Sequence, residues 1–352
     1  MQIFVYEFVT GGGMLTAGSE RPAGSLLAEG RAMAAASTAD LCRIPGVRVV
    51  TTRDERLPPF HPPECQVRLL GEKDQPRKIV AELAAASDWS LLIAPETNGQ
   101  LHALTSLVAD AGGRLLSPAA AVVELASDKQ RTIEYLTAHG VPCPAGRILG
   151  DHIPPPSELF PAVIKPNDGC GSRGVRKLAT PAAMVPWLVE NSLAGPARIE
   201  RFVPGLAASV AVLCGQTQRI PLPACQQLLS ADDRFTYLGG QLPLAARLNR
   251  RAQRLALAAI ETLPDPVGYL GVDLVLGEAT DGSQDYAIEI NPRLTTSYVA
   301  LRALCRTNLA EAMLAVAQGE PPALSWRKLA LQFTAGGRVF PNRKAQFDGC
   351  TS

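Results

Sequence analysis

The sequence is poor in the side chains that build metal clusters. Its 352 residues include only four histidines, and its eight cysteines are scattered along the chain without a CxxC pair. This spacing excludes a zinc site and a disulfide framework, so we expect reduced, structural cysteines. Cys170 lies inside a glycine-rich loop, but no histidine stands near it and a catalytic role is not favoured.

A charge of one sign is also missing. The 34 Lys and Arg residues nearly cancel the 33 Asp and Glu residues, which leaves a formal net charge of +1. We therefore expect no nucleic acid or membrane surface as a partner, and small-molecule substrates instead. The first ten residues lack the features of a signal peptide, and no apolar run reaches the roughly 18 residues of a membrane helix. These absences predict a cytoplasmic protein.

The first third of the chain alternates between strand and helix patterns. Strands are expected at 3–9, 47–51, 90–94 and 114–116, and helices at 25–41, 75–86 and 100–111. This alternation predicts βαβ units and a parallel sheet, which binds ligands beyond the carboxyl ends of its strands. Glu7 and Gly12 follow the first strand, and Glu96 and Asn98 follow the strand at 90–94. These four residues are candidates for substrate binding, with simple turn formation as an equal alternative.

Residues 117–155 carry the signals of two linking helices. Ser117-Pro118 opens the first helix, the segment from Ser127 to Gln130 is interpreted as a capping box of the second, and Gly140 ends it. A proline-rich segment at 153–156 follows. We expect an N-terminal α/β domain (1–116), a second domain (117–320) with linking helices (117–155), a glycine-loop lobe (156–205) and a metal-site lobe (206–320), and a loose C-terminal extension (321–352).

A glycine-rich loop follows the expected strand 162–165. Its glycines spell GxGxxG, but the chain continues as a strand and not as the helix of a dinucleotide-binding fingerprint. We interpret the segment as a hairpin whose tip covers phosphates with backbone N–H groups, while Lys165 reaches the same phosphates. A plain glycine turn is the alternative. The candidate phosphate contacts in the loop are Gly169, Gly171, Ser172 and Gly174.

Two later strands, 270–276 and 286–291, flank a loop rich in Gly and Asp, which predicts a hairpin. Their even-numbered positions are all apolar, so Asp273, Glu289 and Asn291 share the other face, with Asp273 opposite or diagonal to Glu289. Two facing carboxylates repel each other unless a cation lies between them. Oxygen ligands without His or Cys suit Mg²⁺, or the similar Mn²⁺. Solvated carboxylates on an exposed sheet face are the alternative.

The segment 198–205 is expected to be a short strand that ends at Pro204-Gly205. It stands between the glycine loop and the metal hairpin. A strand with free edge groups at this point could hydrogen-bond an adenine, with Glu200 accepting from the exocyclic amine.

In this order, the pieces resemble the ATP-grasp superfamily over residues 117–315, most specifically in the segment Glu289-Ile-Asn-Pro-Arg293. The resemblance implies an α/β (α+β) ATP-grasp fold behind an N-terminal parallel-sheet pre-ATP-grasp domain. It also implies roles for individual residues. Lys129 and Lys165 would hold the phosphates of ATP, Glu200 and the backbone near Phe202 the adenine, and Asp273, Glu289 and Asn291 the Mg²⁺.

Arg293 would neutralise the transferring phosphoryl group and the acyl phosphate, with Lys165 as the second catalytic residue. One departure from the family pattern concerns this role. Several peptide-forming relatives carry an arginine two residues before the metal aspartate, whereas this chain has Gly271. The identity of the arginine that stabilises the intermediate therefore stays open.

The resemblance implies a carboxylate–amine ligase that forms an acyl phosphate and releases ADP. The opening segment 3–8 with its following glycines looks like the ligases that join glutamate to tyramine, or to a tyrosine-derived amine, in methanofuran-type cofactor biosynthesis. A bicarbonate-activating carboxylase-type enzyme and a non-catalytic ATP-binding protein are the alternatives. The oligomeric state stays open, with a homodimer as one of the assemblies considered.

Overall fold

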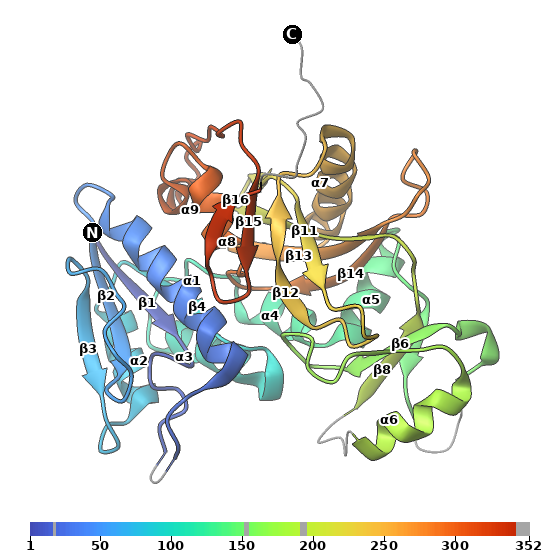
Figure 1. Ribbon diagram of the computed structural model, residues 1–352. Coiled ribbons are helices and arrows are strands. Elements are labelled where there is room, and N and C mark those ends of the chain that lie inside the picture. The colour runs from blue at the N-terminus through green and yellow to red at the C-terminus, as the bar shows by residue number, and fades with distance from the viewer. Residues whose placement is uncertain (17–18, 151–154, 191–195, 343–352) are drawn as a thin grey trace.

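The computed structural model describes residues 1–16, 19–150, 155–190 and 196–342. Three sheets lie side by side, with the N-terminal sheet at one end and a small sheet from the middle of the chain at the other (Figure 1). Within the described residues, none of the helices combines the length and the apolar character needed to cross a bilayer. Residues 153–154 of the proline-rich segment and 343–352 of the expected C-terminal extension lie outside the described residues.

The N-terminal sheet has four parallel strands in the order β3-β2-β1-β4, which confirms the predicted parallel sheet. The edge strand β3 was not expected, because three of its five side chains are exposed and give no apolar pattern. The expected strand 114–116 forms only an isolated bridge between Ser90 and Leu115. The elements are β1 (Gln2–Glu7), α1 (Gly24–Cys42), β2 (Arg48–Asp54), β3 (Gln66–Leu70), α2 (Pro76–Ala85), β4 (Trp89–Ile93), η1 (Thr97–Gly99) and α3 (Gln100–Asp110).

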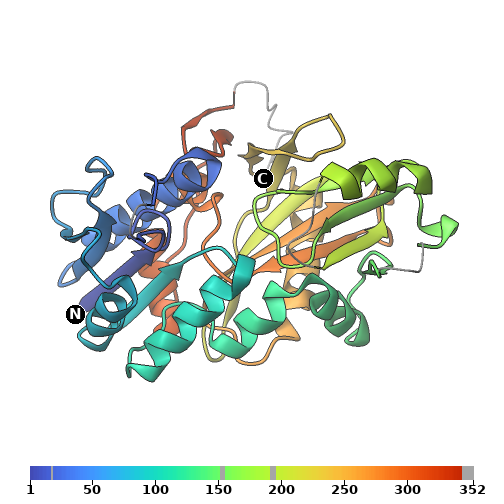
Figure 2. The ribbon, with the colours of Figure 1, turned by 90° about the horizontal axis from the view of Figure 1, so that it is seen from below.

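Two helices, α4 (Ala120–Ser127) and α5 (Lys129–Ala138), link the N-terminal domain to the rest of the molecule and lie along the lower edge of the view in Figure 2. The interpretation of Ser127 as the capping residue of α5 is wrong. Ser127 ends α4, and Asp128 caps α5 by accepting a hydrogen bond of 2.9 Å from the backbone N of Arg131. Asp128 is therefore the single residue that separates the two helices.

The small sheet has the order β5-β8-β6-β7, and all of its pairs are antiparallel. The glycine loop connects β6 to β7, as the hairpin interpretation predicted. The expected free edge of the strand at 198–205 is wrong, because β8 hydrogen-bonds to β5 on one side and to β6 on the other. The elements are β5 (Gly146–Ile148), η2 (Ser157–Leu159), β6 (Ala162–Pro166), β7 (Arg176–Leu178), η3 (Pro181–Ala183), α6 (Met184–Glu190) and β8 (Ala197–Arg201).

The large sheet has eight strands in the order β14-β13-β9-β11-β12-β15-β16, with β10 paired to β9. Its last two strands belong to the segment expected as a loose extension; β15 pairs with β12, so residues 331–341 are part of the sheet. The elements are β9 (Leu206–Cys214), β10 (Arg219–Pro221), β11 (Cys225–Leu229), β12 (Tyr237–Leu242), α7 (Ala246–Glu261), β13 (Gly268–Leu276), β14 (Tyr286–Asn291), α8 (Tyr298–Leu304), α9 (Leu309–Gln318), β15 (Leu331–Thr334) and β16 (Val339–Pro341).

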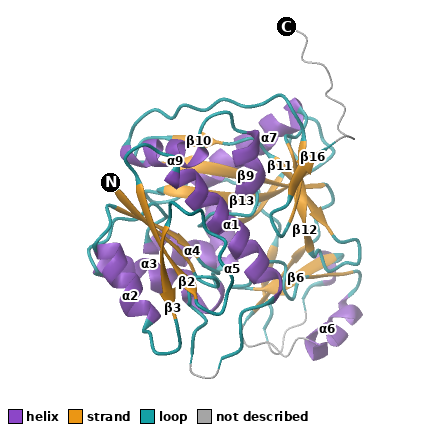
Figure 3. Ribbon diagram, turned by 60° about the vertical axis from the view of Figure 1, so that its left-hand side comes forward, coloured by secondary structure: helices purple, strands orange, loops and turns teal. Residues whose placement is uncertain are grey.

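One hydrophobic core joins the N-terminal sheet to the large sheet. It includes Ile3 and Leu91 of the first and Leu213 and Phe333 of the second, all buried. Helix α1 lies at this junction, beside α8 and α9 (Figure 3). Asp40 of α1 accepts hydrogen bonds from Tyr298 and Arg302 of α8. The core and these bonds fix the N-terminal domain against the side of the molecule that carries the candidate site.

Candidate active site

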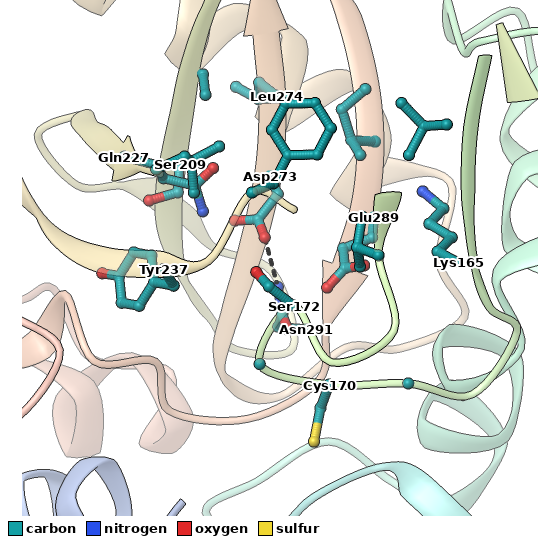
Figure 4. Close-up of a pocket in the computed structure, with 18 of the residues that line it drawn as sticks. Lys165, Cys170, Ser172, Ser209, Gln227, Tyr237, Asp273, Leu274, Glu289 and Asn291 are labelled. Carbon is teal, nitrogen blue, oxygen red and sulfur yellow. Dashed lines mark hydrogen bonds between the residues drawn. The ribbon is translucent and has the colours of Figure 1, made fainter. Parts of the chain in front are cut away.

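A cavity of about 400 Å³ lies between the small sheet, the glycine loop and one face of the large sheet. Strands β6 and β8 form one wall, and β9, β11, β13 and β14 form the opposite wall. Figure 4 shows the carboxylates of Asp273 and Glu289 between Lys165 on one side and Tyr237 on the other. The cavity thus has a lysine side and a tyrosine side, with two acids between them.

Asp273 of β13 and Glu289 of β14 are direct cross-strand partners. It is one of the two arrangements, opposite or diagonal, that the alternation of the two strands predicted. Burial and the neighbouring Glu289 carboxylate raise the pKa of Asp273 to about 7. Burial alone would also raise the pKa of Glu289, but Lys129 and Lys165 hold it below its ordinary value. The two carboxylates repel each other, and the nearby lysines stabilise the charged form of Glu289.

The strict alternation expected for β14 is broken next to this pair. The register shifts between Asp273 and Leu274, so that Leu274 faces Ala287 and one residue of β14 is left over. Ala287 then points into the core, whereas Ile288 lines the cavity beside Glu289. The expectation that Ile288 lies on the apolar face is wrong because a β-bulge changes the side of each residue before it.

The donor set fits a hard divalent cation. Asn291, at the end of β14, donates from Nδ2 to Asp273 at 3.3 Å and lines the same cavity. Asp273, Glu289 and Asn291 offer oxygen atoms only, which is the ligand type that Mg²⁺ prefers, and Mg²⁺ commonly takes further ligands from nucleotide phosphates. No cluster of three His, Cys, Asp or Glu side chains suited to a metal occurs in the described ranges. Nucleotide oxygens would therefore have to complete the coordination sphere.

Lys129 is the first residue of α5 and its side chain is buried. Its Nζ donates to the carbonyl oxygen of Gly169 at 2.6 Å and lies 3.2 Å from a Glu289 oxygen. Asn167 fixes this helix end, because its side chain accepts from the backbone N of Gln130 at 2.9 Å. Lys129 consequently connects the glycine loop with the carboxylate pair.

Lys165, at the end of β6, forms a buried ion pair with Glu200 of β8 at 2.6 Å. The second oxygen of Glu200 lies 2.8 Å from Nε of Arg198, a buried side chain on the same strand. Both carboxylate oxygens of Glu200 thus already have cationic partners, which the sequence did not suggest. Phe202 and Val203 follow directly and line the cavity beyond the last paired residue of β8.

The glycine loop covers one end of the cavity. Gly169, Gly171 and Ser172 line it, and the last two have φ values of 63° and 59°, in the left-handed region. Gly174 does not line the cavity; its carbonyl accepts from Trp187 Nε1 at 3.2 Å, so it joins the loop to α6. Arg173 lines the cavity as well and was not foreseen.

Arg293 follows the end of β14 and carries a buried ion pair. Its Nε and Nη2 lie 2.9 and 3.2 Å from the two carboxylate oxygens of Glu96. The next residues of that segment contact the glycine loop: Thr97 Oγ1 donates to Cys170, and the backbone N of Asn98 donates to Asp168. Glu96 and Asn98 lie outside the cavity lining; Glu96 bonds a cavity residue, Arg293, and substrate binding by either residue stays a prediction.

Glu7 and Gly12 also lie outside the cavity lining. The buried Glu7 carboxylate accepts from the backbone N atoms of Val9 and Thr10, at 3.2 and 2.7 Å, and from the Thr10 hydroxyl at 2.6 Å. Gly12 has a φ of 95° and packs on Leu70. Glu7 is thus the last residue of β1 and Gly12 lies in the loop that follows; their role in substrate binding stays a prediction.

Several cavity residues carry no signal in the sequence. They come from elements far apart in the chain, and none belongs to a recognisable motif: Glu29 from α1, Ser209 from β9, Gln227 from β11, Tyr237 from β12, and Thr296 before α8. Only the tertiary fold brings them together.

Comparison with known families places two domains on the chain. Residues 126–297 match the family described as an ATP-grasp domain, and residues 47–123 match the family described as a pre ATP-grasp 3 domain. The first match contains both lysines, the glycine loop and the carboxylate pair. Together the two matches cover most of the chain.

Two relatives are named tyramine–L-glutamate ligase. The protein from Methanocaldococcus fervens is 28% identical over 235 residues, 66% of this chain and 67% of its own. The protein from Methanocaldococcus jannaschii is 26% identical over 257 residues, 72% of this chain and 71% of its own. Among solved structures, N5-carboxyaminoimidazole ribonucleotide synthetase from Thermotoga maritima has a TM-score of 0.65 at 18% identity and covers 94% of this chain and 79% of its own. This structural likeness shows a common fold.

Proposed function

We infer, from the premise that this chain belongs to the ATP-grasp family, that it is an ATP-dependent carboxylate–amine ligase. The observation that carries this proposal is the cross-strand pair of Asp273 and Glu289, which faces Lys129 and Lys165 across one cavity. The two carboxylates could bind a divalent metal ion, and the nearby lysines could bind the phosphate groups of a nucleotide that shares this ion. A carboxylate substrate would be phosphorylated, and the amine substrate would then displace phosphate to give an amide.

The nucleotide would lie with its phosphates on the lysine side of the cavity. Lys129, Lys165 and the backbone N–H groups of the glycine loop would bind phosphate oxygens. Mg²⁺, held by Asp273, Glu289 and Asn291, would supply charge neutralisation for the phosphates. This assignment rests on the lining residues and on the charge of each side chain.

The adenine would lie at the end of the cavity lined by Phe202 and Val203, which follow β8; the backbone N of Phe202 still donates to the carbonyl of Pro161 at 2.8 Å. Phe202 stacks with Phe235 at a centroid distance of 6.3 Å, which offers an apolar surface for a planar base. Glu200 lines this region too. It would have to share its oxygens with Lys165 and Arg198 to accept from the exocyclic amine.

Phosphoryl transfer needs positioning and charge neutralisation more than covalent help from the protein. Arg293 is the candidate for neutralising the acyl phosphate, because it is the cavity arginine next to the metal ligand Asn291. Its guanidinium keeps its position through Glu96. Because this chain has Gly271 where several relatives carry an arginine, the role would be taken by Arg293 or by Arg173 of the glycine loop.

The names of the two relatives support L-glutamate and tyramine, or a related tyrosine-derived amine, as the first substrate pair to examine. The cofactor context implied by the sequence is methanofuran-type biosynthesis. Bicarbonate is the second candidate, because a fold neighbour, the biotin carboxylase domain of a 2-oxoglutarate carboxylase from Hydrogenobacter thermophilus, was solved in complex with MgADP and bicarbonate.

The test is ADP release with product mass, measured over a panel of carboxylates and amines with Mg²⁺-ATP. We expect an amide product and one ADP for each bond formed, and loss of both in Glu289→Gln. The matched control is Glu72→Gln, which removes an exposed acid of the N-terminal domain. ADP release stimulated by bicarbonate alone would favour the carboxylase-type reaction, and full activity of Glu289→Gln would remove the metal assignment.

A further inference from the structure

Among the described acidic side chains of the cavity, one has neither an ion-pair partner nor a place in the proposed metal site. Glu200 is paired with Lys165 and Glu289 with Lys129, while Asp273 faces Glu289 in the proposed metal site. The remaining acid is Glu29 of α1. Its carboxylate forms no ion pair with any Lys, Arg or His among the residues that the structure describes. The cavity thus contains one half-buried carboxylate that neither the nucleotide nor the metal accounts for.

The packing of α1 holds Glu29 at the cavity. The next residue, Gly30, lies so close to Glu7 that a Cβ there would stand 2.5 Å from a Glu7 oxygen. Asp40, further along the helix, is bonded to Arg302 of α8. With the helix fixed at both points, Glu29 projects beside Thr296, whose hydroxyl donates to it at 3.4 Å. The carboxylate is presented by a rigid element and not by a loop.

The electrostatic surroundings of Glu29 favour an incoming cation. Burial raises the pKa of its carboxyl above the ordinary value, and the more distant Arg293 and the Thr296 hydroxyl only partly oppose this effect. Arg293 acts on Glu29 through its charge but forms no direct ion pair with it, because Nε and Nη2 are bonded to Glu96 and Nη1 to the carbonyl of Leu294. A positively charged ligand group would therefore gain a charge-assisted hydrogen bond at this point.

We propose that Glu29 and Thr296 form a subsite for the protonated amino group of a substrate. An ammonium group has three N–H donors, which match the two carboxylate oxygens of Glu29 and the hydroxyl oxygen of Thr296. Tyr237, also in the cavity lining, lies on the side of Asp273 away from Lys165 (Figure 4). Burial raises the pKa of Tyr237, and the charge of Glu29 is one of the further causes of this rise, so Glu29 lies toward this tyrosine side. We therefore assign the subsite to the carboxylate and amine substrates and not to ATP. This inference rests on the proposed ligase function.

The amino group can come from two sources with the same chemistry. It is either the amine that becomes acylated or the α-amino group of an amino acid whose carboxylate is activated. Two matched ligand pairs separate these sources: tyramine with 4-ethylphenol, and L-glutamate with glutarate. In each pair the second compound lacks only the amino group.

The experiment is calorimetric titration of each compound into the full chain with Mg²⁺ and a non-hydrolysable ATP analogue. We expect the wild type to bind one amino compound roughly 10- to 100-fold more tightly than its amino-free partner. In Glu29→Gln the two compounds should bind about equally, and Glu72→Gln should keep the preference of the wild type. The compound pair that shows the preference identifies the source of the amino group.

Absence of an amino-group preference in the wild type for both pairs would overturn the subsite. A preference that persists in Glu29→Gln would overturn it as well, and this comparison needs only that the variant bind the nucleotide analogue. Thr296→Val provides a second variant, in which the preference should fall without disappearing. Failure of the ligase proposal is a different result, namely no ADP release by the wild type with any substrate pair.

Discussion

Arg293 and Glu96 form a two-point ion pair between the large sheet and the N-terminal domain, with nitrogen–oxygen distances of 2.9 and 3.2 Å. Glu96 is buried and lies outside the cavity, whereas Arg293 lines it. The N-terminal domain thus determines where the guanidinium points. Glu96 is a positioning residue for the reaction proposed above.

Glu96→Gln should lower kcat and leave the KM for ATP nearly unchanged. A neutral amide keeps the shape but loses one of two charge-assisted bonds to Arg293, and misplacement of a catalytic group by about 1 Å costs roughly 10- to 100-fold in rate. Steady-state ADP release measures both constants. Glu96→Asp should recover part of kcat, and a rise in the KM for ATP with unchanged kcat would contradict the positioning role.

The parts of the site that lie on short contiguous segments could be predicted from the sequence. Period-two alternation in 270–276 and 286–291 was enough to place Asp273 opposite or diagonal to Glu289, because register is restricted when one face of a strand is buried, and the structure shows the opposite arrangement. The bulge that turns Ile288 into the cavity leaves no such pattern. One extra residue in β14 moves Ile288 from the core face to the cavity face of the strand, although the even-numbered positions of the segment are all apolar in the sequence.

The parts that depend on contacts between distant segments could not be predicted. The central position of β8 is decided by its pairing with β5 and β6, in which the partners are far apart in the chain: 39 residues for Ala162–Arg201 and 50 residues for Ile148–Arg198. The ion pairs of Glu200 follow from that position. Glu29 likewise reaches the cavity only because α1 packs against α8 and the loop after β1.

Gly30→Ala should destabilise the protein, although the same change in an unobstructed helix interior stabilises by roughly 0.5–1 kcal/mol. The added Cβ would stand 2.5 Å from the buried Glu7 carboxylate, so α1 or Glu7 must shift. Thermal unfolding gives the sign directly. We expect a lower Tm together with weaker binding of the amino compound; a raised Tm would show that the contact relaxes without strain.

Arg251→Ala should be among the most destabilising changes in the large sheet. Arg251 of α7 and Asp285 form a buried ion pair, and Arg251 Nη2 also donates to the carbonyl of Gly277 at 2.7 Å. Removing one partner leaves Asp285 buried and unpaired, which costs roughly 3–5 kcal/mol. Urea unfolding measures the loss.

Arg131→Ala is the matched control for that change, because its ion pair with Glu124 is exposed. An exposed pair contributes about 0–1 kcal/mol. Equal losses in the two variants would contradict the assignment of the Arg251 pair as a structural element of the hairpin between β13 and β14.

Asp273→Asn should raise stability and abolish activity together. Asp273 and Glu289 face each other in adjacent strands, and no cation is bonded to Asp273 in the described part of the chain. Replacing one carboxylate by an amide removes this repulsion, so the Tm in EDTA should rise above that of the wild type. The same change removes a proposed Mg²⁺ ligand, so the further rise that Mg²⁺-ATP gives the wild type should shrink or vanish. Glu278→Gln, an exposed acid in the loop of the same hairpin, is the control and should behave like the wild type in both measurements. A variant that keeps the full Mg²⁺-ATP stabilisation would show that the cation binds elsewhere.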